Sequence, residues 1–274
     1  MSFENRMTHS SDGVRIAYSV SGMAEVALLL IHGGLADRTF WDGQHSALSE
    51  QFRVIALDLA EHGDSGSNRQ EWGILPFAHD VTAVIEAEKL QSVVLVGNSL
   101  GGTVGIEAAL LARERALGVV GVDTFHDLGR RIDPTWAREQ AEAWRRDFGG
   151  ALAQMLRALF HSDADPSLVA RVRRGMSKMS VETVSAMFLS LAGYDTGASA
   201  RQLRIPVRCI NGDLFPTNTP ASRKVVSDFD AVVLPHTGHF PMLENPGEFD
   251  CKLAHFAAAF HPFQSREAPG LKTA

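Results

Sequence analysis

Short runs of consecutive apolar residues alternate with segments of helical periodicity along most of this chain. The apolar runs lie at residues 26–31, 52–57, 93–96 and 117–122. Each is short enough to be a strand buried on both faces. Residues 76–90 and 103–112, which lie between these runs, have the spacing or the Ala and Leu content of helices. Strands that alternate with helices predict βαβ units and a parallel sheet.

Both ends of the chain extend this pattern. Ser11-Asp12-Gly13 is a turn signal and predicts an antiparallel hairpin over residues 7–18. Strand character returns at residues 206–211 and 231–234, and residues 246–260 place their apolar side chains on one helical face. The tail, residues 265–274, is predicted to be disordered. The fold class expected from the whole pattern is α/β, with a mostly parallel central sheet flanked by helices.

Residues 127–200 interrupt the alternation of strands and helices. From Trp136 to Leu159 the apolar positions recur at steps of three or four, with the polar Gln140 as the exception. Gly149-Gly150 is expected to break or bend this helix, and residues 181–191 predict a second helical stretch. We therefore expect an inserted helical cap at 127–200, between core segments 1–126 and 201–274. Its apolar stripe serves either core packing or a substrate wall.

Composition narrows the class of protein. The chain has 274 residues, enough for a large core, and its net charge of -6 gives no reason to expect nucleic-acid binding. No apolar run approaches the roughly 20 residues that span a bilayer, and the first residues, MSFENRMTHS, show no secretory signal. We expect a cytoplasmic protein with a small-molecule substrate and no membrane or nucleic-acid partner. Oligomeric state does not follow from the sequence.

Cysteine and histidine positions give no sign of a metal site. Cys209 lies in an apolar strand-like run and Cys251 in the last predicted helix, so we expect two buried free thiols rather than a disulfide. No Cys/His cluster has the spacing of metal ligands. No metal and no organic cofactor are predicted.

The pentapeptide Gly97-Asn98-Ser99-Leu100-Gly101 follows a predicted strand and precedes a predicted helix. This G-x-S-x-G pattern places a serine on a sharp strand-to-helix turn, with its hydroxyl lifted clear of the sheet. The two outer glycines let strand and helix approach without Cβ clashes. In this strand–turn–helix context the pattern predicts a nucleophilic serine.

Other polar or glycine-rich segments follow the carboxyl ends of neighbouring strands. Gly33-Gly34 comes after residues 26–31 and leaves backbone N–H groups free to form an oxyanion hole. Asp123 comes after residues 117–122, and ligands of parallel sheets collect at this edge. For His32, Asp58 and His62 we expect structural roles in fixing their loops.

Together with the late Gly238-His239, these features resemble an α/β-hydrolase over nearly the whole chain. Residues 58–65 (DLAEHGDS) are similar to the family's loop after the strand that precedes the serine strand, and residues 238–246 (GHFPMLENP) to its histidine segment. The family usually takes its catalytic acid from the fourth residue of a G-x-x-D pattern, which here is Phe215. Some members carry the acid after the next strand beyond the serine, so we choose Asp123 over Asp213, since a triad is recognised by geometry.

The resemblance implies a serine hydrolase with Ser99 as nucleophile, His239 as base and Asp123 as its orienting acid. The backbone N–H groups of Gly34 and Leu100 would form the oxyanion hole. Carboxylic ester hydrolysis is the first expectation. Cleavage of carbon–carbon bonds in ring-fission products and lactone hydrolysis are alternatives, and ligand binding with little turnover is a further one.

Overall fold

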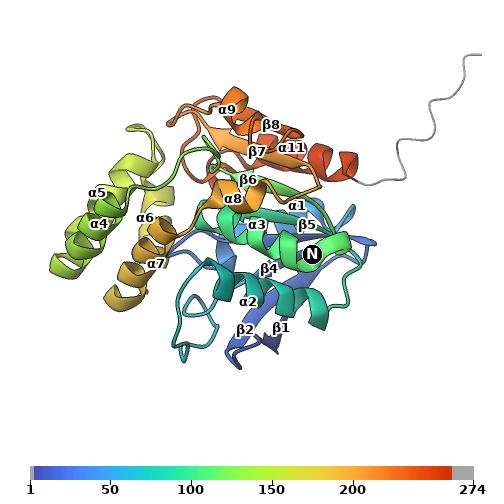
Figure 1. Ribbon diagram of the computed structural model, residues 1–274, viewed down its shortest axis with the longest axis horizontal. Coiled ribbons are helices and arrows are strands. Elements are labelled where there is room, and N and C mark those ends of the chain that lie inside the picture. The colour runs from blue at the N-terminus through green and yellow to red at the C-terminus, as the bar shows by residue number, and fades with distance from the viewer. Residues whose placement is uncertain (1–2, 261–274) are drawn as a thin grey trace, which may run out of the picture.

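The computed structural model describes residues 3–260, so the tail predicted to be disordered lies outside the described residues. One eight-stranded sheet organises this part of the chain, in the order β1-β2-β4-β3-β5-β6-β7-β8 (Figure 1). Among the strands of residues 3–260 only the β1/β2 and β2/β4 pairs are antiparallel, which confirms the predicted hairpin and the mostly parallel sheet. The strands are β1 (Glu4–His9), β2 (Arg15–Ser21), β3 (Val26–Ile31), β4 (Arg53–Leu57), β5 (Ser92–Asn98), β6 (Ala116–Val122), β7 (Val207–Gly212) and β8 (Phe229–Leu234).

Helices cover both faces of the sheet (Figure 1). On one face α2 (Ile74–Ala87) packs against α3 (Leu100–Ala112), and on the other α1 (Asp42–Leu48) contacts α11 (Pro246–Ala259). The central strands are therefore buried on both sides, and residues 27–31 of β3 are fully buried. This burial explains why the central strands are continuous apolar runs without alternation. The short helices of the core are α9 (Thr219–Arg223), α10 (Pro241–Glu244) and the 3-10 turns η1 (Arg38–Trp41) and η2 (Arg113–Arg115).

Between β6 and β7 the described chain forms helices and no strand. These are α4 (Pro134–Arg146), α5 (Phe148–Leu159), α6 (Pro166–Met176), α7 (Val181–Gly193) and α8 (Thr196–Ala200). Figure 1 shows α4 to α7 as a separate layer beside the sheet. The predicted helix break is misplaced, because Gly149 and Gly150 lie in the first turn of α5. The chain turns at Asp147, whose carboxylate caps α5 by accepting a 2.9 Å hydrogen bond from the Gly150 N–H.

The cysteine prediction is wrong for one residue. Cys209 on β7 is buried, but Cys251 on α11 is exposed, because the apolar face of that helix is formed by Phe249, Leu253 and Phe256. Both thiols are free. Among the helices of residues 3–260, none combines the length and the apolar character that crossing a membrane requires.

A buried histidine on α1 makes the stability of this fold depend on pH. His45 is 2% exposed and lies between Ser19 and Ser21 of β2, whose hydroxyls are 2.9 and 2.7 Å from its ring nitrogens. Burial lowers the pKa of His45 to about 4. The unfolded chain binds this proton near pH 6.5, so below that pH the unfolded state binds more protons than the native state.

We therefore expect the free energy of unfolding to fall as the pH drops from about 6.5 toward 4, with about 3 kcal/mol of the loss due to His45. Urea unfolding at about pH 7 and about pH 4.5 measures this loss. His45→Asn should remove that part of the pH dependence. His255→Asn, on the exposed side of α11, should leave it unchanged. An identical pH dependence in His45→Asn and the wild type would contradict the prediction.

Candidate active site

Ser99 occupies a strained turn between β5 and α3. Its backbone has φ 51 and ψ -116, a conformation that costs a non-glycine residue on the order of 1–3 kcal/mol. A Cβ on Gly97 would lie 2.1 Å from the Gly101 carbonyl oxygen, and one on Gly101 would lie 2.4 Å from the Ile31 carbonyl oxygen. Strand and helix therefore approach too closely for any side chain, as the motif predicts.

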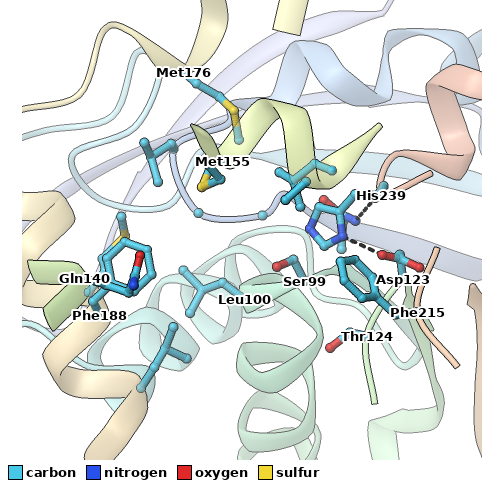
Figure 2. A pocket seen from close by; sticks show the side chains of 18 of the residues that line it. Ser99, Leu100, Asp123, Thr124, Gln140, Met155, Met176, Phe188, Phe215 and His239 are labelled. Carbon is cyan, nitrogen blue, oxygen red and sulfur yellow. Dashed lines mark hydrogen bonds and ion pairs between the residues drawn. The ribbon is translucent and has the colours of Figure 1, made fainter. Parts of the chain in front are cut away.

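Asp123 follows β6 and holds the ring of His239. Its Oδ2 atom lies 2.5 Å from His239 Nδ1 (Figure 2). Its Oδ1 atom accepts a 3.0 Å hydrogen bond from the Gly212 N–H. The carboxyl group is buried, which by itself would raise its pKa. The nearby His126 ring and the hydrogen bond from His239 outweigh burial and hold the pKa of Asp123 well below its usual range. The carboxylate is thus ionised at neutral pH and aimed at the imidazole.

His126 is a second histidine beside Asp123 that the sequence reasoning did not single out. Its Nε2 atom lies 3.7 Å from Asp123 Oδ1, and its ring meets the edge of Phe215 at a centroid distance of 5.7 Å. The sequence does place His126 three residues after Asp123, beyond the carboxyl end of a strand, where ligand-binding residues collect. The carboxylate therefore has a histidine on each oxygen.

The loop that carries His239 is fixed from three directions. The His239 N–H donates to the Leu159 carbonyl of the cap at 2.9 Å, and its carbonyl accepts a 3.0 Å bond from the Asn98 amide. The Glu244 carboxylate accepts bonds from the backbone N–H groups on either side of the histidine, at 2.9 and 2.8 Å. Burial raises the pKa of Glu244. Sequence reasoning missed both Asn98 and Glu244 as positioning residues, although both stood in the quoted motifs.

Backbone donors face the same region. Within residues 3–260 neither the Gly34 N–H nor the Leu100 N–H has a hydrogen-bond partner. Gly34 belongs to the loop after β3, and Leu100 begins α3, where the first N–H groups of a helix have no internal acceptor. A Cβ on Gly34 would contact the Leu100 side chain at 3.7 Å, which places the two residues together. They are available as a pair of anion donors.

The expected structural roles of three neighbouring polar residues are confirmed. The buried His32 ring accepts a 3.1 Å bond from the Leu59 N–H and lies 2.7 Å from the Gly33 carbonyl. Asp58 accepts bonds from the backbone N–H groups of Arg38 and Asp64, and it forms an ion pair with the Arg38 side chain. The His62 ring lies 2.9 Å from the Ala60 carbonyl. These contacts hold together the loops that follow β3 and β4.

Asp213 is not brought to His239. Its carboxylate accepts bonds from His161 Nε2 at 2.7 Å and from the backbone N–H groups of His236 and Thr237 at 2.8 and 3.2 Å. The backbone bond from His236, joined by the other contacts, lowers the pKa of Asp213. This partly exposed carboxylate therefore joins the cap to the histidine loop and does not orient the His239 ring.

Cap and core enclose a cavity of about 620 Å³. Ser99, His239 and Asp123 line its floor, and the side chains above them are mostly apolar and come from α4 to α7 (Figure 2). No hydrogen bond joins the Ser99 hydroxyl to His239 among the described residues, and such bonds are often long without substrate. The apolar cap stripe serves both predicted purposes, because Leu152 and Leu156 are core residues whereas Trp144 and Met155 line the cavity.

Comparison with known proteins agrees with this geometry. The family model described as "Alpha/beta hydrolase family" matches residues 28–250, and the chain belongs to that family. The predicted fold and resemblance are thereby confirmed. The structure of this chain resembles that of a thermophilic esterase from Thermogutta terrifontis, with a TM-score of 0.81 and 25% sequence identity. The match covers 95% of this chain and 100% of the esterase chain.

Two curated relatives match different lengths of this chain. The chain is 28% identical to a pimeloyl-[acyl-carrier protein] methyl ester esterase of Nitrosomonas europaea over 243 residues, which cover 81% of this chain and 92% of the relative. It is 36% identical over 97 residues to an uncharacterized protein of Mycobacterium tuberculosis. That match spans only 28% of the relative's length.

Proposed function

We propose that this chain is a serine hydrolase that cleaves carboxylic esters of small to medium, largely apolar substrates. The observation that carries the proposal is the 2.5 Å contact between His239 Nδ1 and a buried, ionised Asp123, on the floor of a cavity that Ser99 also lines. A nucleophile, a base and a group that orients the base are the parts that acyl transfer needs. The mostly apolar cavity suits an apolar substrate.

In this mechanism Ser99 Oγ attacks the ester carbonyl carbon while His239 Nε2 takes the hydroxyl proton. The carbonyl oxygen gains the negative charge, which the N–H groups of Gly34 and Leu100 stabilise. His239 then gives its proton to the departing alcohol, and an acyl-enzyme remains. A water molecule that gives a proton to His239 attacks that acyl group, and His239 returns the proton to Ser99 Oγ as the acyl–oxygen bond breaks and the carboxylic acid leaves. Asp123 stabilises the imidazolium throughout without becoming protonated.

Esters are the proposed substrates because full-length relatives of this chain carry esterase names. Two of them, at 25% and 28% identity, are pimeloyl-[acyl-carrier protein] methyl ester esterases. Carbon–carbon hydrolysis, lactone hydrolysis and ligand binding with little turnover stay predictions from the sequence. A small-molecule substrate and a cytoplasmic location are part of the proposal.

Two measurements on the wild type test the proposal together. Steady-state assays with p-nitrophenyl esters from acetate to laurate should give saturable hydrolysis. An alkyl fluorophosphonate should inactivate the protein by forming an Oγ–P bond with loss of fluoride, and peptide mass spectrometry should locate the label on Ser99. Hydrolysis with the label on another residue would refute the assigned nucleophile. An absence of both hydrolysis and labelling would refute the proposed function.

A further inference from the structure

One polar side chain of the cap interrupts the apolar wall above the catalytic floor. Gln140 lies on α4 between Trp136 and Trp144, one helical turn from each, and all three line the cavity. Phe188 of α7 contacts both indole rings, at centroid distances of 5.9 and 6.2 Å. In Figure 2 Gln140 and Phe188 lie on the opposite side of the view from His239.

The Gln140 side chain is half-buried, and its amide makes no hydrogen bond among residues 3–260. An amide carries two N–H donors and a carbonyl acceptor, and covering it with an apolar chain leaves these groups unpaired. Among the described cap residues that line the cavity, the one other amide is that of Gln154, which is exposed, and the indole N–H groups of Trp136 and Trp144 are the other polar side-chain groups. The other polar lining side chains belong to the catalytic floor. A substrate that fills the cavity therefore meets one isolated amide under the cap.

The charge of the lining restricts what this amide binds. Among the described residues that line the cavity there is no Lys or Arg, and the one carboxylate, Asp123, is already held by His239. A charged group under the cap would lose its water without gaining a counter-ion. An uncharged carbonyl or hydroxyl would gain a hydrogen bond from the amide and lose little.

We propose that Gln140 is a specificity-determining residue that binds an uncharged hydrogen-bonding group, a carbonyl or a hydroxyl, on the part of the substrate beneath the cap. The inference rests on the proposed esterase function and narrows its substrate class. The preferred esters are thus apolar chains with one neutral polar group placed away from the scissile bond.

Shape-matched ester pairs test this proposal. One pair is p-nitrophenyl 5-oxohexanoate and p-nitrophenyl 5-methylhexanoate, and a second pair, 3-oxobutyl and 3-methylbutyl acetate, carries the polar group on the alcohol. We expect the wild type to prefer the oxo ester in at least one pair. In Gln140→Met, which keeps the shape but removes the amide, that ratio of kcat/KM values should fall about tenfold. Glu139→Met, an exposed position on the same helix, should keep the wild-type ratio.

The outcomes separate this inference from the proposed function. If the wild type hydrolyses the methyl-branched esters but Gln140→Met leaves both ratios unchanged, the role of Gln140 is refuted while the esterase function stands. If no ester is hydrolysed, calorimetric titration of Ser99→Ala with the same pairs tests Gln140 without turnover. The oxo compound should bind about tenfold tighter than its partner, and equal binding refutes the inference.

Discussion

Ser99→Ala is expected to lower kcat for p-nitrophenyl ester hydrolysis by about 10⁶-fold while the protein stays folded. The hydroxyl supplies the electron pair that forms the acyl-enzyme, and the alanine methyl group cannot replace it. The oxyanion donors are backbone groups that the substitution leaves in place, so a small residual rate above that in water should persist. Among the described residues the Ser99 hydroxyl makes no hydrogen bond, so its loss should cost little stability.

The variant Ser99→Gly distinguishes the effect of the serine hydroxyl on catalysis from the effect of this position on stability. Ser99 has φ 51, where a Cβ is strained and glycine is not, so Ser99→Gly should unfold at a higher temperature than Ser99→Ala and be equally inactive. Thermal unfolding followed by circular dichroism measures the first effect. Ser190→Ala, on α7 of the cap and outside the cavity lining, should keep wild-type kcat. Hydrolysis at near wild-type rates by Ser99→Ala would refute the nucleophile.

The strands and the serine turn were predictable because the residues that mark each of them lie close together in the sequence. A strand buried on both faces must be apolar throughout, and residues 26–31 and 93–96 show this directly. The turn at Ser99 needs Gly97 and Gly101 because the backbones of neighbouring segments fill the space of their Cβ atoms. The apolar residues lie in the strands themselves, and the two glycines lie within two residues of Ser99.

The features that were missed depend on particular hydrogen bonds and side-chain contacts, which residue spacing does not reveal. The chain turns at Asp147, whose carboxylate caps α5. The predicted break lies two residues later, at the glycine pair. Asn98 bonds to the His239 carbonyl, and Glu244 bonds to the backbone N–H groups on either side of His239. No spacing in the sequence predicts such bonds. The pairing of His126 with Asp123 likewise arises from how the chain folds back after β6.

Asp123 and Asp213 are the two candidates for the acid that orients His239, and their positions relative to its ring differ. Asp123 Oδ2 lies 2.5 Å from the His239 ring, whereas the bonds of Asp213 go to His161 and to the backbone at His236 and Thr237. We expect Asp123→Asn to lower kcat about 10⁴-fold, because an amide no longer fixes the productive tautomer or stabilises the imidazolium. Asp213→Asn should change kcat less than about tenfold.

The two substitutions are matched, because each replaces a carboxylate by an amide of the same size. In Asp123→Asn the Oδ1 acceptor for the Gly212 N–H is kept, so the strand end should stay in place. Steady-state kinetics, with thermal unfolding as a check on folding, measure both effects. Because the pKa of Asp123 lies well below its usual range, this carboxyl should stay ionised at mildly acidic pH and contribute nothing to the loss of activity there. A folded Asp213→Asn that is inactive, beside an active Asp123→Asn, would move the acid to Asp213 and leave the serine hydrolase intact.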